Sequence, residues 1–254
     1  MFLIFNKEKI QTYIVSILTV SVLVALALVG PNKSIQVSTT ERLLPIYNVK
    51  TEEKKIAFTM NCAWNADDID KILEVLKENN VQITFFMVGT WVDKYPEAVK
   101  KISDAGHEIG SHSNTHPHVD NLSLEKNKEE IYQSVSKIEK ITGKKVELYR
   151  TPYGEYNNIV IKSIQEAGYY PIHWNLDTLD YNGLTGNEMW NRIKNKLENG
   201  SIILSHNGTK NTADSLDMLL KNIKSKGYEI VKVSDLIYKD NYSINNNGTQ
   251  IRNQ

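Results

Sequence analysis

The sequence of 254 residues contains a single cysteine and has no excess of charge of either sign. One cysteine excludes a disulfide framework within the chain, so the fold must be held together by packing. The 30 Lys and Arg residues balance the 30 Asp and Glu residues. A formal charge of zero gives no electrostatic reason to expect a nucleic acid partner. The sequence leaves the oligomeric state open.

Charged residues are also absent from Ile10–Val29, and this run is long enough to cross about 30 Å of hydrocarbon as a helix. Lys7 and Lys9 precede it, which favours a cytoplasmic N-terminus and a following domain outside the cell membrane. We therefore expect a single-pass membrane anchor. The alternative is a signal peptide that is removed to secrete the domain, because Ala25-Leu26-Ala27 resembles a cleavage site.

After a turn-rich stretch, short apolar runs alternate with segments of helical periodicity. For example, the strand-like Val81–Val88 follows Asp67–Asn80, whose apolar residues have helical spacing. Alternating strands and helices with short links predict parallel strands covered by helices, and about seven such units predict an α/β fold, a distorted (β/α)7-8 barrel. The expected segments are a cytoplasmic N-terminus at 1–9, a transmembrane anchor or signal at 10–30, a linker at 31–54, the barrel domain at 55–238 and a disordered polar tail at 239–254.

Polar clusters fall where the predicted strands end, which is where the reacting groups of such a barrel lie. Each cluster also has an ordinary structural explanation, because histidines four residues apart can share a helix face and Pro-Tyr-Gly can simply form a turn. Asp residues after a strand can cap a loop. The clusters are Asn61-Cys62, His112-Ser113-Asn114-Thr115-His116, Arg150-Thr151-Pro152-Tyr153-Gly154, Asp177-Thr178-Leu179-Asp180-Tyr181 and Leu204-Ser205-His206.

Taken together and in this order, the clusters resemble the motifs of the polysaccharide deacetylases with a NodB homology domain, carbohydrate esterase family 4. The family motifs run Thr-Phe-Asp-Asp, His-Ser/Thr-x-x-His, Arg-x-Pro-Tyr, Asp-x-x-Asp-Trp and Leu-x-His. The resemblance spans Ile56 to Val231. It implies a hydrolase that removes N-acetyl groups from cell-wall polysaccharide, either peptidoglycan or a chitin-like polymer of N-acetylglucosamine.

The resemblance implies a catalytic role for several matching residues. His112 and His116 map onto the histidines that hold one divalent metal ion, most often zinc. His206 maps onto the general acid, and Asp177 maps onto the carboxylate that orients it. Arg150 maps onto the arginine that holds the base.

Other matching residues are implied to bind the substrate. The backbone N–H of Tyr153 maps onto a donor to the oxyanion, and Leu204 maps onto the wall of the acetyl pocket. Tyr181 stands where the family has Trp, which keeps an aromatic wall against the sugar.

The first cluster departs from the family pattern. Asn61 stands at the place of the base, but an amide has no useful basicity. Cys62 stands at the place of the metal-binding carboxylate, where it is expected either to complete a Cys-His-His zinc site as a thiolate or to be a small buried hydrophobe. Asp67 and Asp68 are expected to cap the following helix. His107 and His118 are expected at the surface.

Two functions follow from this mixture. The first is an exported, metal-dependent deacetylase of cell-wall N-acetyl sugars with weakened activity, and the intact Arg150, Asp177 and His206 favour it. The alternative is a catalytically silent member of the family that binds wall glycan, and the Asn61-Cys62 pair favours it. A glycosidase is not expected, because no pair of carboxylates is evident at the predicted strand ends.

Overall fold

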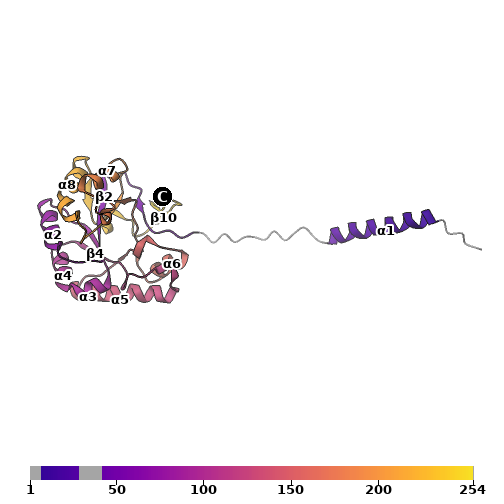
Figure 1. Ribbon diagram of the computed structural model, residues 1–254, viewed down its shortest axis with the longest axis horizontal. Helices are drawn as coiled ribbons and strands as arrows, with labels where there is room; N and C mark the ends of the chain where they lie inside the picture. The colour runs from indigo at the N-terminus through magenta and orange to yellow at the C-terminus, as the bar shows by residue number, and fades with distance from the viewer. Residues whose placement is uncertain (1–6, 29–41, 254) are drawn as a thin grey trace, which may run out of the picture. The chain divides into compact units, whose positions relative to one another are not determined.

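The computed structural model describes residues 7–28 and 42–253 of the chain (Figure 1). Helix α1 (Lys7–Leu28) belongs to one compact unit, and the residues from Arg42 onwards form another. The stretch Lys7–Ala25 is long and apolar enough to cross a membrane, and a signal sequence near the N-terminus has the same properties. The expected N-terminal apolar helix is therefore present. Residues 1–6 of the expected cytoplasmic segment, residues 29–30 of the span and residues 31–41 of the expected linker lie outside the described residues.

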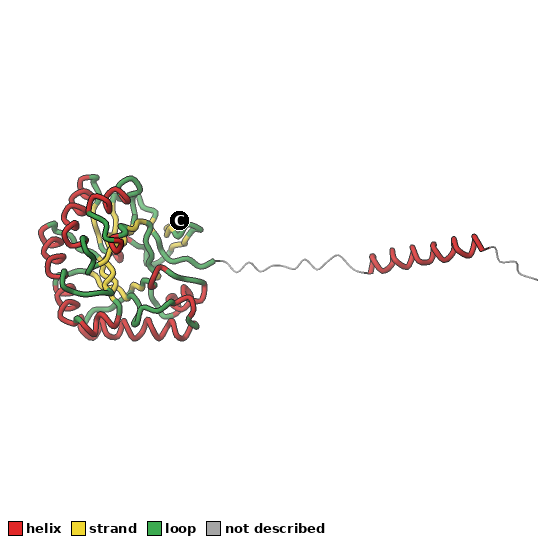
Figure 2. Tube along the Cα trace, in the orientation of Figure 1, coloured by secondary structure: helices red, strands yellow, loops and turns green. Residues whose placement is uncertain are grey.

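The second unit is built around an eight-stranded parallel sheet, with the strands inside and the helices around them (Figure 2). Strand β9 (Glu229–Val231) pairs with the beginning of β2. No pairing joins the two outermost strands in the described part of the chain, so the sheet is an open half-barrel. This confirms the predicted α/β class and barrel type. The other strands, in hydrogen-bonding order, are β6 (Tyr170–Pro171), β5 (Leu148–Tyr149), β4 (Glu108–Ser111), β3 (Thr84–Met87), β2 (Lys55–Cys62), β8 (Ile202–His206) and β7 (Leu176–Asp177).

The helices follow the strands along the chain, and local sequence signals fix their ends. Ser123 caps α5 by accepting a hydrogen bond from Lys126 N, and Gly143 ends the same helix in a left-handed conformation. Thr185 and Glu188 form a capping box at the start of α7. The helices are α2 (Ile69–Glu78), α3 (Gly89–Lys94), α4 (Pro96–Asp104), α5 (Leu124–Thr142), α6 (Asn158–Glu166), α7 (Gly186–Ile193), α8 (Thr212–Ser225) and α9 (Val233–Leu236).

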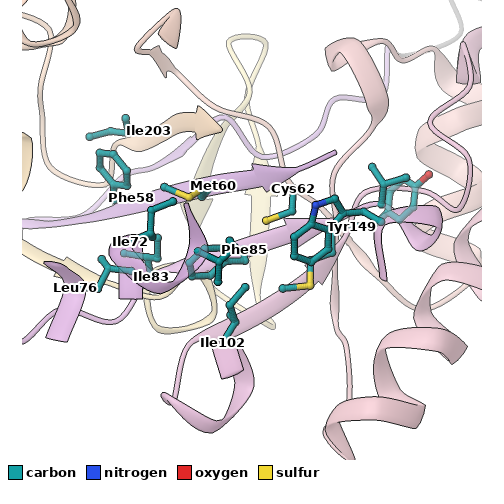
Figure 3. Close-up of a cluster of buried hydrophobic side chains, with 14 of the residues drawn as sticks. Phe58, Met60, Cys62, Ile72, Leu76, Ile83, Phe85, Ile102, Tyr149 and Ile203 are labelled. Carbon is teal, nitrogen blue, oxygen red and sulfur yellow. The ribbon is translucent and has the colours of Figure 1, made fainter. Parts of the chain in front are cut away.

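Strand β2 divides its side chains between two environments, and this division positions the site. Phe58, Met60 and Cys62 are fully buried in the main hydrophobic cluster (Figure 3). Successive residues of a strand point to opposite faces, so Thr59 and Asn61 face the other way. Both of these side chains hydrogen bond to Arg150.

The expected linker and disordered tail are folded wherever the structure describes them. Ile46 pairs with Ile172 next to β6, and β1 (Asn48–Val49) pairs in parallel with β11 (Thr249–Arg252). Strand β10 (Tyr242–Ile244) pairs antiparallel with β11 to complete a small three-stranded sheet. The linker therefore ends before Arg42 rather than at residue 54, and the prediction of a disordered tail is wrong.

The polar composition of the tail reflects turn chemistry. The side-chain oxygen of Asn245 accepts hydrogen bonds from the backbone N–H groups of Asn247 and Thr249, which fixes the turn between the two strands. Gln250 is fully buried, and its amide exchanges two hydrogen bonds with the backbone of Tyr238. Polar residues that satisfy one another in this way do not need a large apolar core to remain ordered.

Candidate glycan-binding and catalytic site

A cavity of about 660 Å³ lies at the C-terminal ends of the strands and contains most of the predicted site residues. Arg150 is fully buried and hydrogen bonds to Asn61 in the cavity wall, whereas Cys62 does not line the cavity. A larger cavity of about 950 Å³, near the start of β3 and β9, contains none of these residues. The lining of the first cavity is Asn61, Ala63, Trp64, Val88, Thr90, His112, Thr115, His116, Tyr153, Trp174, Asp177, Tyr181, Leu204 and His206.

Asn61 connects two buried groups through its amide. Its side-chain oxygen accepts a hydrogen bond from Nη1 of Arg150 at 3.0 Å, and its nitrogen lies 3.1 Å from Nε2 of His112. A guanidinium can only donate, so the amide oxygen must face Arg150. Nδ1 of His112 donates to the backbone oxygen of Arg150 at 2.8 Å, which leaves Nε2 as an acceptor for the Asn61 amide.

Arg150 is a buried cation without a carboxylate among its hydrogen-bond partners. Its guanidinium donates to Thr59 Oγ1 and to the backbone oxygen of His173, and it lies 4.0 Å from the centre of the Phe86 ring. Burial lowers the pKa of Arg150 to about 9, so the charge persists at neutral pH. The base side of the site, formed by Asn61, His112 and Arg150, therefore contains one positive charge that hydrogen bonds to no carboxylate among the described residues.

His112 and His116 meet through a loop rather than along the face of a helix. Ser113 and His116 adopt left-handed conformations with φ of 66° and 59°, and the backbone N–H of His116 donates to Ser113 Oγ. The two imidazole rings lie 4.9 Å apart and nearly perpendicular. Burial lowers the pKa of both histidines, most strongly for His112, so both rings are neutral at pH 7.

The structure contradicts the assignment of Cys62 as a metal ligand. The side chain is fully buried beside Met60 in the main hydrophobic cluster, on the face of β2 opposite Asn61. Burial raises the pKa of the thiol well above its usual value, which disfavours the thiolate that would bind zinc. Of the two readings of this cysteine, the buried hydrophobe is correct.

The remaining residues do not fit the zinc site that the resemblance implies. Two imidazoles are present, but the Nε2 lone pair of His112 accepts from the Asn61 amide, and the charge of Arg150 lies on the other side of that amide. Within residues 7–28 and 42–253, no group of three His, Cys, Asp or Glu side chains could hold a metal ion. A catalytic zinc usually needs three protein ligands.

His206 and the carboxylate that contacts it form the acid side of the site. That carboxylate belongs to Asp180, not to the predicted Asp177. Asp180 is fully buried, and its carboxylate lies 2.8 Å from Nδ1 of His206. It also accepts hydrogen bonds from the backbone N–H of His206 at 2.6 Å and from Thr212 Oγ1 at 2.7 Å. Asp177 instead accepts from the backbone N–H of Leu179, and burial raises its pKa.

Sequence reasoning missed some residues and misplaced others. Asp180 is the second acid of the Asp-x-x-Asp motif, so the signal for it was present. Trp64 and Trp174 line the cavity without belonging to any motif considered. Asp68 does not cap α2 through its side chain and instead accepts hydrogen bonds from Asn207 and Gly208.

Comparison with known proteins places the chain in a family. The family model for polysaccharide deacetylase matches residues 48–172. The uncharacterised protein YlxY of Bacillus subtilis is 34% identical over 76% of this chain, which spans 60% of the length of YlxY. The peptidoglycan-N-acetylmuramic acid deacetylase PdaA of Bacillus subtilis is 30% identical over 80% of this chain and 78% of its own length. A peptidoglycan-N-acetylglucosamine deacetylase of Bacillus cereus is 32% identical over 75% and 92% of the two chains.

A solved structure adds a second kind of relative. BA3943 of Bacillus anthracis, described as a pseudoenzyme of carbohydrate esterase family 4, is 32% identical with a TM-score of 0.73 over 76% of this chain and 68% of its own. A BA3943 mutant is described as having restored enzymatic activity. This chain therefore belongs to the polysaccharide deacetylase family, carbohydrate esterase family 4.

Proposed function

We propose that this protein binds N-acetylated cell-wall glycan in the cavity at the strand ends and is strongly impaired as a deacetylase. The observation that carries the proposal is the amide of Asn61, which occupies the place of the base between Arg150 and His112. The zinc ion that the resemblance implies is not part of the proposal, because the residues present do not fit it.

The missing chemistry has a large expected cost. A positioned general base typically contributes about 10²–10⁴-fold to the rate of proton transfer steps. An amide can orient a water molecule by hydrogen bonding but cannot accept its proton at neutral pH. Asn61 also directs its N–H toward the neighbouring imidazole and its oxygen toward Arg150, so both ends of the amide are already engaged.

The cavity has the composition of a sugar-binding groove. Its lining combines the aromatic rings of Tyr153 and Tyr181 with polar groups such as Thr90 and Asp177, and Leu204 contributes an apolar wall. Relatives of this chain are named as deacetylases of peptidoglycan. Peptidoglycan, or another polymer that contains N-acetylglucosamine, is therefore the ligand class that we assign to the cavity.

Slow deacetylation is the second candidate, and the pair of His206 and Asp180 favours it. The Asp180 carboxylate lies 2.8 Å from Nδ1 of His206 and orients the ring, and an oriented histidine that lines the cavity can act as a general acid toward a leaving amine. Simple glycan binding gives no reason for a buried carboxylate that fixes Nδ1 of His206. A residual activity would then depend on His206 as the acid, without any side chain that takes the proton of the attacking water.

We also propose that the domain acts outside the cytoplasm. Helix α1 would serve either as an uncleaved anchor or as a signal sequence, and both would export the following domain. Protease added to intact cells should then digest the domain, unless it has been secreted into the medium. Full protection of the domain inside the cells would contradict export.

The function is tested by measuring binding and acetate release together. The purified domain should bind N-acetylglucosamine oligomers or peptidoglycan fragments in calorimetry, while releasing far less acetate than a peptidoglycan deacetylase assayed alongside it. Acetate release at a comparable rate would overturn the proposed impairment. If acetate release is slow but disappears in a His206→Ala variant that still binds, the second candidate is correct.

A further inference from the structure

Exposed aromatic side chains gather at one place on the domain. Among the described residues from 42 onwards, the exposed large hydrophobic side chains are Trp64, Tyr132, Tyr153, Ile159 and Tyr181. Trp64, Tyr153 and Tyr181 all line the 660 Å³ cavity. Leaving apolar surface in water is unfavourable, and exposed apolar groups that cluster in a concave site mark a binding surface. The function of Trp64 is not explained by any family motif considered above.

Hydrogen bonds at the next residue fix the main chain beside Trp64, a residue that is 48% exposed. It lies directly after β2, and the backbone oxygen of the next residue, Asn65, accepts hydrogen bonds from Nε1 of Trp91 and from the side chain of Asn207. The side-chain oxygen of Asn65 accepts a further bond from the backbone of Asp67. A preorganised aromatic ring loses little conformational entropy when a ligand packs on it.

Trp64 and Tyr181 both lie next to His206, the proposed acid. The centre of the Trp64 indole is 5.3 Å from that of the His206 ring with an interplanar angle of 36°, and the Tyr181 ring is also 5.3 Å away but perpendicular. A ligand that reaches His206 must therefore pass beside two aromatic rings. Asn61 and Asp177 line the same cavity and offer polar partners.

We infer that Trp64 is a stacking platform for one sugar ring of the bound glycan and a residue that determines its specificity. A pyranose with equatorial substituents has an apolar C–H face that packs on an indole, while its hydroxyl and amide groups extend from the edge toward polar partners. This packing suits the equatorially substituted N-acetyl sugars of the proposed glycan. This inference rests on the proposed glycan binding and adds the residue that selects the ring.

The test compares three variants in calorimetric binding to a β-linked N-acetylglucosamine tetramer, with dextran as the α-linked control. Trp64→Ala should weaken binding at least about tenfold, as expected when a buried aromatic anchor is truncated. Trp64→Phe keeps an aromatic face and should lose less than about threefold. Tyr132→Ala removes an aromatic side chain that is also 48% exposed but does not line the cavity, and it should bind like the wild type. Equal thermal midpoints would show that all variants are folded.

The outcomes separate this inference from the proposed function. If the wild type binds the tetramer and Trp64→Ala binds equally well, the role of Trp64 is wrong while glycan binding stands. If the wild type binds dextran as tightly as the tetramer, the specificity is wrong. If the wild type binds no glycan, both the proposed function and the inference fail. A change in tryptophan fluorescence on binding that is lost in Trp64→Phe would support direct stacking.

Discussion

The two sides of the cavity differ in the charge of their polar groups. On the acid side, His206 contacts the carboxylate of Asp180. On the base side, the Asn61 amide joins neutral His112 to charged Arg150, and no carboxylate contacts any of the three. The amide keeps the network of hydrogen bonds closed while it removes both the basicity and the negative charge. The geometry of the network is therefore compatible with a residue that cannot act as a base.

Replacing Asn61 with Asp should remove this difference and have the largest effect. The new carboxylate would face the donors of Arg150 at the present 3.0 Å and would supply the base that the amide lacks. We expect acetate release from N-acetylglucosamine oligomers to rise at least about tenfold, and a positioned base typically contributes more, about 10²–10⁴-fold.

The control for this gain is a second substitution on the acid side. Adding His206→Ala to Asn61→Asp should remove the added activity, although His206 hydrogen bonds to Asp180 and not to Asn61. A folded Asn61→Asp variant that releases no more acetate than the wild type would contradict the account of the base side. The restored activity described for a BA3943 mutant gives a precedent within the fold.

Cys62→Asp, which would complete the family's pair of acids, should instead damage the protein. The side chain is fully buried among apolar groups on the far face of β2, so a carboxylate there would be desolvated without a partner. We expect a loss of about 3–5 kcal/mol in the free energy of unfolding, as for an unpaired buried charge. Urea denaturation measures it, with Cys62→Ala as the control that loses only about 1 kcal/mol. A stable Cys62→Asp variant that binds metal more tightly would show that position 62 can contribute a metal ligand.

The sequence was sufficient to predict the family and the α/β class from the order of the motifs and the alternation of strands and helices. It also predicted that the motifs cluster, because the C-terminal ends of parallel strands meet at one edge of the sheet. It did not decide between Asp177 and Asp180, since that choice depends on the turn after β7, where Leu179 is left-handed. Because side chains alternate along a strand, Asn61 and Cys62 of β2 point to opposite faces. The family motif instead predicts that both residues belong to the site. The role of Trp64 could be inferred only from the cavity in the structure, because that role depends on neighbours that are distant in sequence.

Buried histidines should make the fold sensitive to acid. His107, expected at the surface, is buried and accepts a hydrogen bond from the backbone of Ile83, and burial lowers its pKa to about 4. In the unfolded chain, His107 binds a proton near pH 6.5. The free energy of unfolding is therefore highest above pH 6.5 and decreases as the pH falls toward 4.

The expected loss is about 2 kcal/mol between pH 7 and pH 5 for His107. His173, whose pKa burial also lowers to about 4, adds a similar loss. Urea denaturation of the wild type at the two pH values measures the sum over all buried histidines, to which His112 and His116 also contribute. His107→Gln should reduce the dependence on pH by about 2 kcal/mol, and His118→Gln, an exposed position, gives the control. Equal dependence in the wild type and His107→Gln would contradict burial as the cause.

Asp180→Asn tests whether the acid side can accommodate an amide, as the base side does with Asn61. A smaller effect is expected than for the preceding variants. One oxygen of Asp180 accepts from the backbone N–H of His206, and the other accepts from the backbone N–H of Tyr181. Whichever way an Asn amide is turned, one of these N–H groups meets a donor, which should cost about 1–3 kcal/mol. Asn61 has no such conflict, because its neighbour His112 offers an acceptor.

The control is Asp177→Asn, which keeps an oxygen that can accept from the backbone N–H of Leu179. It should cost less than about 1 kcal/mol in the same urea titration. Equal losses for the two variants would mean that the two sides do not differ in their tolerance of an amide.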